Sequence, residues 1–149
     1  MTGNTTSIYG SFEHGPFSLE YLRFGNGPRP VFAFHGYGRR AEDFAIFSPH
    51  LASDITLYSF NLFGHGRTRY PKERMERSTI GKKEWASIFR AFLDELGAEQ
   101  AAVIGYSLGG RTSLCLLELM PERISGAYLF APDGLHRFSW YRWVTRIPG

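Results

Sequence analysis

The sequence contains one cysteine, Cys115, among its 149 residues. A single cysteine excludes an internal disulfide framework and a metal site built from several cysteines. Cys115 lies in the apolar segment 113–117, where a cysteine is expected to pack as a small hydrophobic side chain. No group of histidine, cysteine and carboxylate residues has the spacing of metal ligands. We therefore expect neither a metal nor another cofactor.

Long apolar runs, repeats and low-complexity segments are also missing. No apolar stretch approaches the roughly 20 residues that a membrane-spanning helix needs. Residues 1–6 carry neither the basic leader nor the apolar core of a signal peptide. The sequence therefore predicts no membrane span, and a cytoplasmic location is the default expectation.

Positive charge exceeds negative charge only slightly, with a formal net charge of +3 at pH 7. Much of the excess comes from arginines and lysines between residues 67 and 83, where Glu73 and Glu76 interrupt the basic residues. A nucleic-acid surface needs a recognisable binding module as well as basic charge. We interpret this segment as a solvated loop and expect no nucleic-acid partner.

The composition that remains is typical of a globular domain, with 43% hydrophobic and 21% charged residues. Short β-rich runs are predicted at residues 18–24, 31–34, 55–60, 101–105 and 127–130, and helices at residues 41–51, 82–96 and 108–120. The clearest helix is 82–96, whose apolar residues recur every three or four positions. We expect 127–130 to be a buried strand. The alternation predicts an α/β fold with a mostly parallel sheet and helices on both faces.

A G-x-S-x-G motif at residues 105–109 stands directly between a predicted strand and a predicted helix. Serine hydrolases use this motif to place a serine on a sharp strand-to-helix turn that exposes its hydroxyl. The small residues on either side let neighbouring backbone pass. A serine in an ordinary turn is the alternative, but the placement favours Ser107 as a catalytic nucleophile.

A second glycine-containing loop follows the predicted strand 31–34, where the sequence reads His35-Gly36-Tyr37-Gly38. In hydrolases of this architecture, the corresponding loop and the residue after the serine each supply one backbone amide to an oxyanion hole. The amides of Tyr37 and Leu108 are therefore the predicted oxyanion-hole donors.

Five segments, 35–38, 61–68, 105–110, 120–124 and 129–132, occur in the order found in one known family. Together they resemble the α/β-hydrolase superfamily, in particular its serine esterase, lipase and peroxidase-like branch. The resemblance covers residues 18 to 135 and implies an α/β-hydrolase core that is truncated after about the sixth strand. The family usually has aspartate at position 61, and we interpret Asn61 as structural.

The resemblance also implies a division of the chain and a missing part of the catalytic apparatus. Residues 1–135 would form the N-terminal half of the core, and the aromatic-rich residues 136–149 would begin the lid. The catalytic acid and histidine of the family follow later strands, and none of the five histidines matches that histidine. His35 and His65 are expected to shape loops. Asp133 follows the last predicted strand, and a turn-forming role is favoured over catalysis.

The resulting hypothesis is a serine hydrolase that acts on a carboxylic ester or related small acyl substrate through Ser107. Without the histidine and acid, the isolated chain is expected to be inactive. A non-catalytic remnant or interaction module that keeps the hydrolase sheet is the alternative. The open edge of the last strand predicts self-association or pairing with a complementing C-terminal half.

Overall fold

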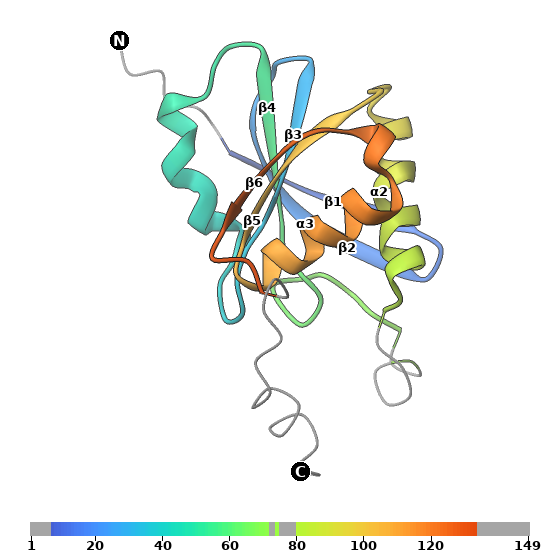
Figure 1. Ribbon diagram of the computed structural model, residues 1–149. Coiled ribbons are helices and arrows are strands. Elements are labelled where there is room, and N and C mark those ends of the chain that lie inside the picture. Colours follow the sequence, from blue (N-terminus) through green and yellow to red (C-terminus); the bar gives the residue numbers. More distant parts are fainter. Residues whose placement is uncertain (1–6, 72–73, 75–79, 134–149) are drawn as a thin grey trace.

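The computed structural model describes residues 7–71, 74 and 80–133 (Figure 1). The predicted start of a lid at residues 136–149 lies outside the described residues. The strands are β1 (Ile8–His14), β2 (Phe17–Gly25), β3 (Arg29–Phe34), β4 (Ile55–Phe60), β5 (Ala101–Tyr106) and β6 (Ile124–Phe130). The helices are η1 (Ala41–His50), α2 (Lys82–Glu95), α3 (Leu108–Leu119) and the single turn η2 (Pro121–Arg123).

The six strands form one sheet in the order β1-β2-β4-β3-β5-β6. Strands β4, β3, β5 and β6 are parallel, and β1 and β2 extend the sheet antiparallel at one side. Helix η1 lies on one face, and α2 and α3 lie on the other (Figure 1). The expected α/β class, with a mostly parallel sheet and helices on both faces, is therefore confirmed.

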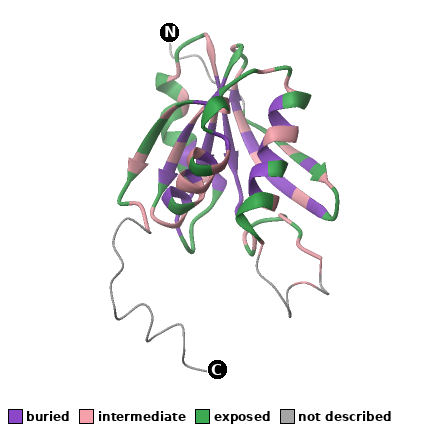
Figure 2. Ribbon diagram, turned by 45° about the vertical axis from the view of Figure 1, so that its right-hand side comes forward, coloured by how far each residue is buried: buried purple, intermediate pink, exposed green. Residues whose placement is uncertain are grey.

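Aromatic side chains fill the larger core, between the sheet and helices α2 and α3. Phe32 of β3 is fully buried and packs against Phe89 and Phe92 of α2, with ring centroids 5.6 and 5.5 Å apart. The predicted apolar face of residues 82–96 is the face that α2 buries. In Figure 2 the buried residues are concentrated in the central strands and on the inner sides of the helices.

Three elements of the structure, one helix and two strands, differ from what the sequence predicts. Strand β1 was not predicted, because its residues show little apolar alternation and only Phe12 is buried. Residues 41–50 of the predicted helix 41–51 form a 3₁₀ helix with Pro49 inside it. The prediction that 127–130 is buried is wrong: within the described sheet β6 is an edge strand that pairs with β5 alone, and it is largely exposed.

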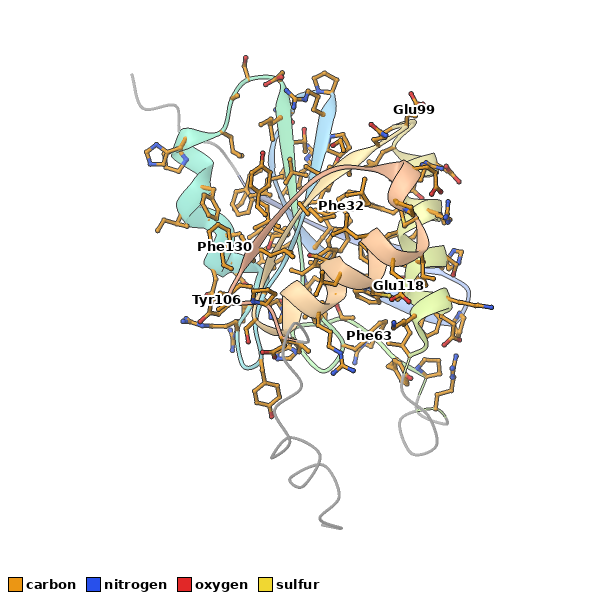
Figure 3. All side chains as sticks on the ribbon, viewed as in Figure 1. Phe32, Phe63, Glu99, Tyr106, Glu118 and Phe130 are labelled. Carbon is orange, nitrogen blue, oxygen red and sulfur yellow. The ribbon has the colours of Figure 1, made fainter. Side chains whose placement is uncertain are left out.

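Helix η1 covers only part of its face of the sheet. Tyr106, Tyr128 and Phe130 lie beyond it on β5 and β6, and they are 42%, 62% and 52% exposed. Figure 3 shows Tyr106 and Phe130 on the same side of the sheet as η1, opposite Phe32. An apolar surface therefore follows β5 and β6. No helix among the described residues has the length and hydrophobicity needed to cross a membrane.

Candidate active site

Ser107 lies at the junction between β5 and α3, at the carboxyl ends of the parallel strands. Its backbone has φ 51° and ψ −113°, a conformation that non-glycine residues rarely adopt. The Ser107 N–H donates to the Phe130 carbonyl at 3.0 Å, and its own carbonyl accepts from the Gly110 N–H at 2.8 Å. Strained backbone of this kind persists where surrounding bonds impose it, as they do here.

Glycines make this junction possible by letting α3 approach the sheet closely. A Cβ atom at Gly105 would lie 2.5 Å from the Gly109 carbonyl oxygen. A Cβ atom at Gly109 would collide with the Phe34 carbonyl, and one at Gly110 would collide with Pro132. The spacing of the motif therefore follows from steric contact between the helix and strands β3 and β5.

The loop after β3 lies against the serine. A Cβ atom at Gly36 would be 2.9 Å from Tyr106 Cδ1 and 3.4 Å from Ser107 Cβ. Tyr37 follows directly, with its side chain 85% exposed. Leu108 is the first residue of α3, so its N–H has no acceptor within the helix. Within the described part of the chain, neither the Tyr37 nor the Leu108 N–H donates to a protein atom.

His35 is buried beneath this loop, and both of its ring nitrogens have partners. Its Nε2 accepts from the Leu62 N–H at 3.0 Å, which leaves the proton on Nδ1, 2.7 Å from the Gly36 carbonyl. Burial lowers the pKa of His35 and outweighs the opposing hydrogen bond to Gly36. A neutral imidazole therefore joins the loop after β3 to the loop after β4.

His65 makes a second connection between the same two loops. Its Nε2 accepts from the Gly38 N–H at 3.1 Å, and its Nδ1 lies 3.2 Å from the Phe63 carbonyl. The His65 and His35 rings are in edge contact, with centroids 4.7 Å apart. Among the residues described, no histidine forms a hydrogen bond with Ser107. His136 lies outside them.

Asp133 contacts Ser107 directly. The Ser107 hydroxyl donates to Asp133 Oδ2 at 3.4 Å, and the Asp133 N–H donates to the Ser107 carbonyl at 3.0 Å. In a Ser-His-Asp triad an imidazole stands between hydroxyl and carboxylate, with a hydrogen bond of about 2.7–3 Å on each side. A separation of 3.4 Å leaves no room for that ring. The turn interpretation of Asp133 did not anticipate this contact.

Comparison with known proteins identifies the architecture around this site. The family model described as "alpha/beta hydrolase fold" matches residues 29–148, which is most of the chain. The chain belongs to this family. Membership in the α/β-hydrolase family supports a hydrolase-like function with a small-molecule substrate. No group of three or more metal-ligating side chains occurs within the described ranges.

The matches to two individual relatives include most of this chain but less than a third of each relative. The dihydrolipoyllysine-residue acetyltransferase component of the acetoin cleaving system of Cupriavidus necator is 30% identical over 116 residues, 78% of this chain and 30% of the relative. The Pseudomonas putida component of the same name is 30% identical over 111 residues, 74% of this chain and 29% of the relative. The chain thus spans under a third of these two relatives.

A solved structure of the same fold is 2-hydroxy-6-oxo-6-phenylhexa-2,4-dienoate hydrolase from a Rhodococcus strain. It superposes with a TM-score of 0.71 at 24% identity, covering 88% of this chain and 48% of the hydrolase. The chain therefore shares the fold of about half of this hydrolase.

Proposed function

We propose that this chain carries the nucleophile of a serine hydrolase that acts on carboxylic esters or related acyl substrates. The observation that carries the proposal is the backbone of Ser107. It is held at φ 51° between strand and helix, beside the loop that contains the Tyr37 amide. A strand-to-helix turn of this kind exposes a nucleophilic serine in α/β-hydrolases.

The chemistry follows from the groups around Ser107. The hydroxyl oxygen attacks the acyl carbon, its proton passes to a base, and the carbonyl oxygen becomes an oxyanion. The N–H groups of Tyr37 and Leu108 stabilise that oxyanion. Collapse of the tetrahedral intermediate expels the alcohol, which takes the proton from the base, and leaves an acyl-enzyme. Water, deprotonated by the same base, then attacks the acyl carbon, and the carboxylic acid leaves as Ser107 regains its proton. Loss of one oxyanion donor typically costs about 3–4 kcal/mol of transition-state stabilisation.

The base is not one of the histidines beside the site. His35 and His65 already use both ring nitrogens to connect loops. A serine without a base is a weak nucleophile. The Asp133 carboxylate lies 3.4 Å from the Ser107 hydroxyl oxygen, which is longer than the roughly 2.6–3.2 Å over which a general base removes a proton. We therefore propose that the isolated chain is inactive and that the base comes from further sequence.

The exposed surface along β6 supports a complementing partner. Tyr128 and Phe130 are more than half exposed on a strand that, among the strands described, pairs with β5 alone. The relatives described above are about three times as long as the region they share with this chain. We propose that a C-terminal half extends the sheet at β6, and self-association through the same edge is the alternative.

One observation favours the non-catalytic alternative. The Ser107 hydroxyl already has a partner, Asp133, without any imidazole, and a binding module would keep such a contact at no functional cost. The amides of Tyr37 and Leu108, which have no acceptor among the described residues, argue the other way, since a module without acyl chemistry has no need of two such donors beside a serine.

Labelling with a fluorophosphonate distinguishes a serine hydrolase from a non-catalytic module. The full chain is incubated with the probe, with and without added imidazole as an external base, and the modified residue is located by peptide mass spectrometry. We expect imidazole-dependent labelling at Ser107, and none at Ser113, which is fully buried further along α3. Ser107→Ala is the control. Absence of labelling at Ser107 with imidazole present would support the non-catalytic module.

A further inference from the structure

A buried carboxylate lies on β2, next to the edge strand β1, on a strand that contributes nothing directly to the Ser107 site. Glu20 of β2 is only 6% exposed. Its Oε2 accepts from Asn61 Nδ2 at 2.8 Å and from the Arg67 N–H at 2.8 Å, and its Oε1 accepts from Arg67 Nε at 2.6 Å. A buried charge with three donors is stabilised only while all of them remain in place.

The first branch of this network reaches the end of the loop after β3. The Asn61 side chain donates to Glu20 and, through Oδ1, accepts from the Ala41 N–H at 2.9 Å. Ala41 begins helix η1 and closes the loop that carries Tyr37. The Ser59 hydroxyl donates to the Ala41 carbonyl at 2.8 Å, so this residue is fixed from both sides.

The second branch reaches the middle of the same loop. By binding the Arg67 N–H, Glu20 fixes the turn at residues 64–68. The Thr68 hydroxyl holds that turn from its other end, donating to the Asn61 carbonyl at 2.6 Å and accepting from the Glu20 N–H at 3.0 Å. The turn presents His65, whose Nε2 accepts from the Gly38 N–H. Gly38 is the residue directly after Tyr37.

We propose that Glu20 is a positioning residue that aims the Tyr37 amide at the substrate oxygen. It does so by fastening the loop after β3 at two points, Gly38 through His65 and Ala41 through Asn61. This inference rests on the proposed function for its purpose, but the structural coupling can be measured without any catalysis.

The network also explains why asparagine stands at position 61. An amide both donates to Glu20 and accepts from Ala41, whereas an ionised aspartate there would place a second carboxylate against Glu20. The pair is therefore matched, and exchanging the two functional groups should preserve the contact between positions 20 and 61. In the double variant E20Q/N61D, the carboxylate at position 61 accepts from the amide at position 20 and from the Ala41 N–H. The carbonyl of that same amide can accept from Arg67 Nε, but the Arg67 N–H, which shares Oε2 with Asn61 in the wild type, loses its acceptor.

The test measures amide hydrogen exchange in the full chain carrying Ser107→Ala, so that no result depends on the chemistry of the serine. In Glu20→Gln we expect the Gly38 and Ala41 amides to exchange about tenfold faster, because the charged acceptor that holds both branches is lost. Amides of β5 should change less than about twofold. The double variant E20Q/N61D should restore slow exchange at Ala41 and leave Gly38 fast, because only the branch through position 61 regains its hydrogen bond. Glu118→Gln removes an exposed ion pair with Lys82 and is the matched control.

Each outcome of the exchange experiment either supports or overturns the proposed role of Glu20. Unchanged exchange at Gly38 and Ala41 in a folded Glu20→Gln protein would overturn the proposal, as would equal acceleration throughout the sheet that the double variant fails to reverse at Ala41. Should Glu20→Gln not fold, Asn61→Asp alone breaks the contact by placing a second carboxylate against Glu20. Loop-specific acceleration in it, reversed at Ala41 in E20Q/N61D, would support the proposal, and its absence would contradict it. Failure of the proposed function appears separately, as absence of fluorophosphonate labelling with the exchange pattern intact.

Discussion

Gly109 of the serine motif and Gly126 of β6 differ in how much room a side chain would have. A Cβ atom at Gly109 would collide with the Phe34 carbonyl, whereas a Cβ atom at Gly126 would meet nothing within 4 Å. We predict that Gly109→Ala destabilises the protein by about 1–3 kcal/mol, the usual cost of overpacking. Gly126→Ala, the control, should change stability by less than about 0.5 kcal/mol. Urea unfolding followed by circular dichroism measures both, and equal effects would contradict the steric argument.

His35 predicts a pH dependence of stability. Burial lowers its pKa, while Asp43 and Glu42 oppose the shift and neighbouring His65 adds to it. The unfolded chain therefore binds a proton at higher pH than the folded chain does. The contribution of His35 to stability is complete above its unfolded pKa of about 6.5 and is lost as the pH falls towards the lowered folded value.

The variant His35→Gln tests this dependence, since its side-chain oxygen can still accept from the Leu62 N–H. We expect the wild type to lose up to about 1.4 kcal/mol more stability per pH unit than the variant below about pH 6.5. Urea titrations from about pH 7.5 to about pH 5 measure the difference. Parallel curves for the two proteins would show that His35 is not the group responsible.

At the scale of single residues, the local sequence predicted where the candidate site residues lie better than it predicted which residues they contact. Ser107, Tyr37 and Leu108 were assigned from glycine spacing next to strands. The structure places Tyr37 on the loop after β3, beside the junction of β5 and α3 where Ser107 and Leu108 lie. Their catalytic roles stay predictions. The Asp133 contact was missed because it depends on the register of β5 and β6, which pairs Tyr106 with Phe130. The role of Glu20 was missed because its partners lie more than 40 residues away in the chain.

At the scale of elements, α2 and β6 both carry apolar side chains, but those of α2 are packed in the core and those of β6 are largely exposed. Phe89 of α2 is fully buried, and Phe130 of β6 is 52% exposed. We predict that Phe89→Ala costs about 3–5 kcal/mol, enough to threaten a domain whose total stability is typically about 5–15 kcal/mol. Phe130→Ala should cost under about 1 kcal/mol, because the half-exposed ring makes few packing contacts that its removal would lose. Thermal unfolding compares them, and similar losses would show that β6 is covered.

Elements with a strong internal period were predicted accurately from sequence. Helix α2 spans Lys82–Glu95 and buries the face expected for residues 82–96. Strand β1 was missed because its stability comes from pairing with β2 rather than from its own pattern. The exposure of β6 was mispredicted because an apolar run resembles a buried strand whether or not a neighbour covers it.

At the scale of the whole molecule, the uncovered side of β5 and β6 predicts association. Edge strands with exposed apolar side chains pair readily with other chains. We expect the purified chain to show a molar mass that rises with concentration in light scattering after size-exclusion chromatography. Replacing both Tyr128 and Phe130 with lysine should lower that mass towards the 16.9 kDa of the monomer. A wild-type chain that remains monomeric at all concentrations would count against the proposed partner surface.

Nuclear magnetic resonance on the phosphonylated chain tests whether the Tyr37 and Leu108 amides form an oxyanion hole at Ser107. Attaching a fluorophosphonate to Ser107 places a phosphoryl oxygen where the oxyanion would form. We expect the backbone amide protons of Tyr37 and Leu108 both to shift downfield on modification, while Ser107→Ala remains unmodified and unshifted. Modification at another residue, or an adduct on Ser107 that leaves both amide signals unchanged, would contradict this expectation.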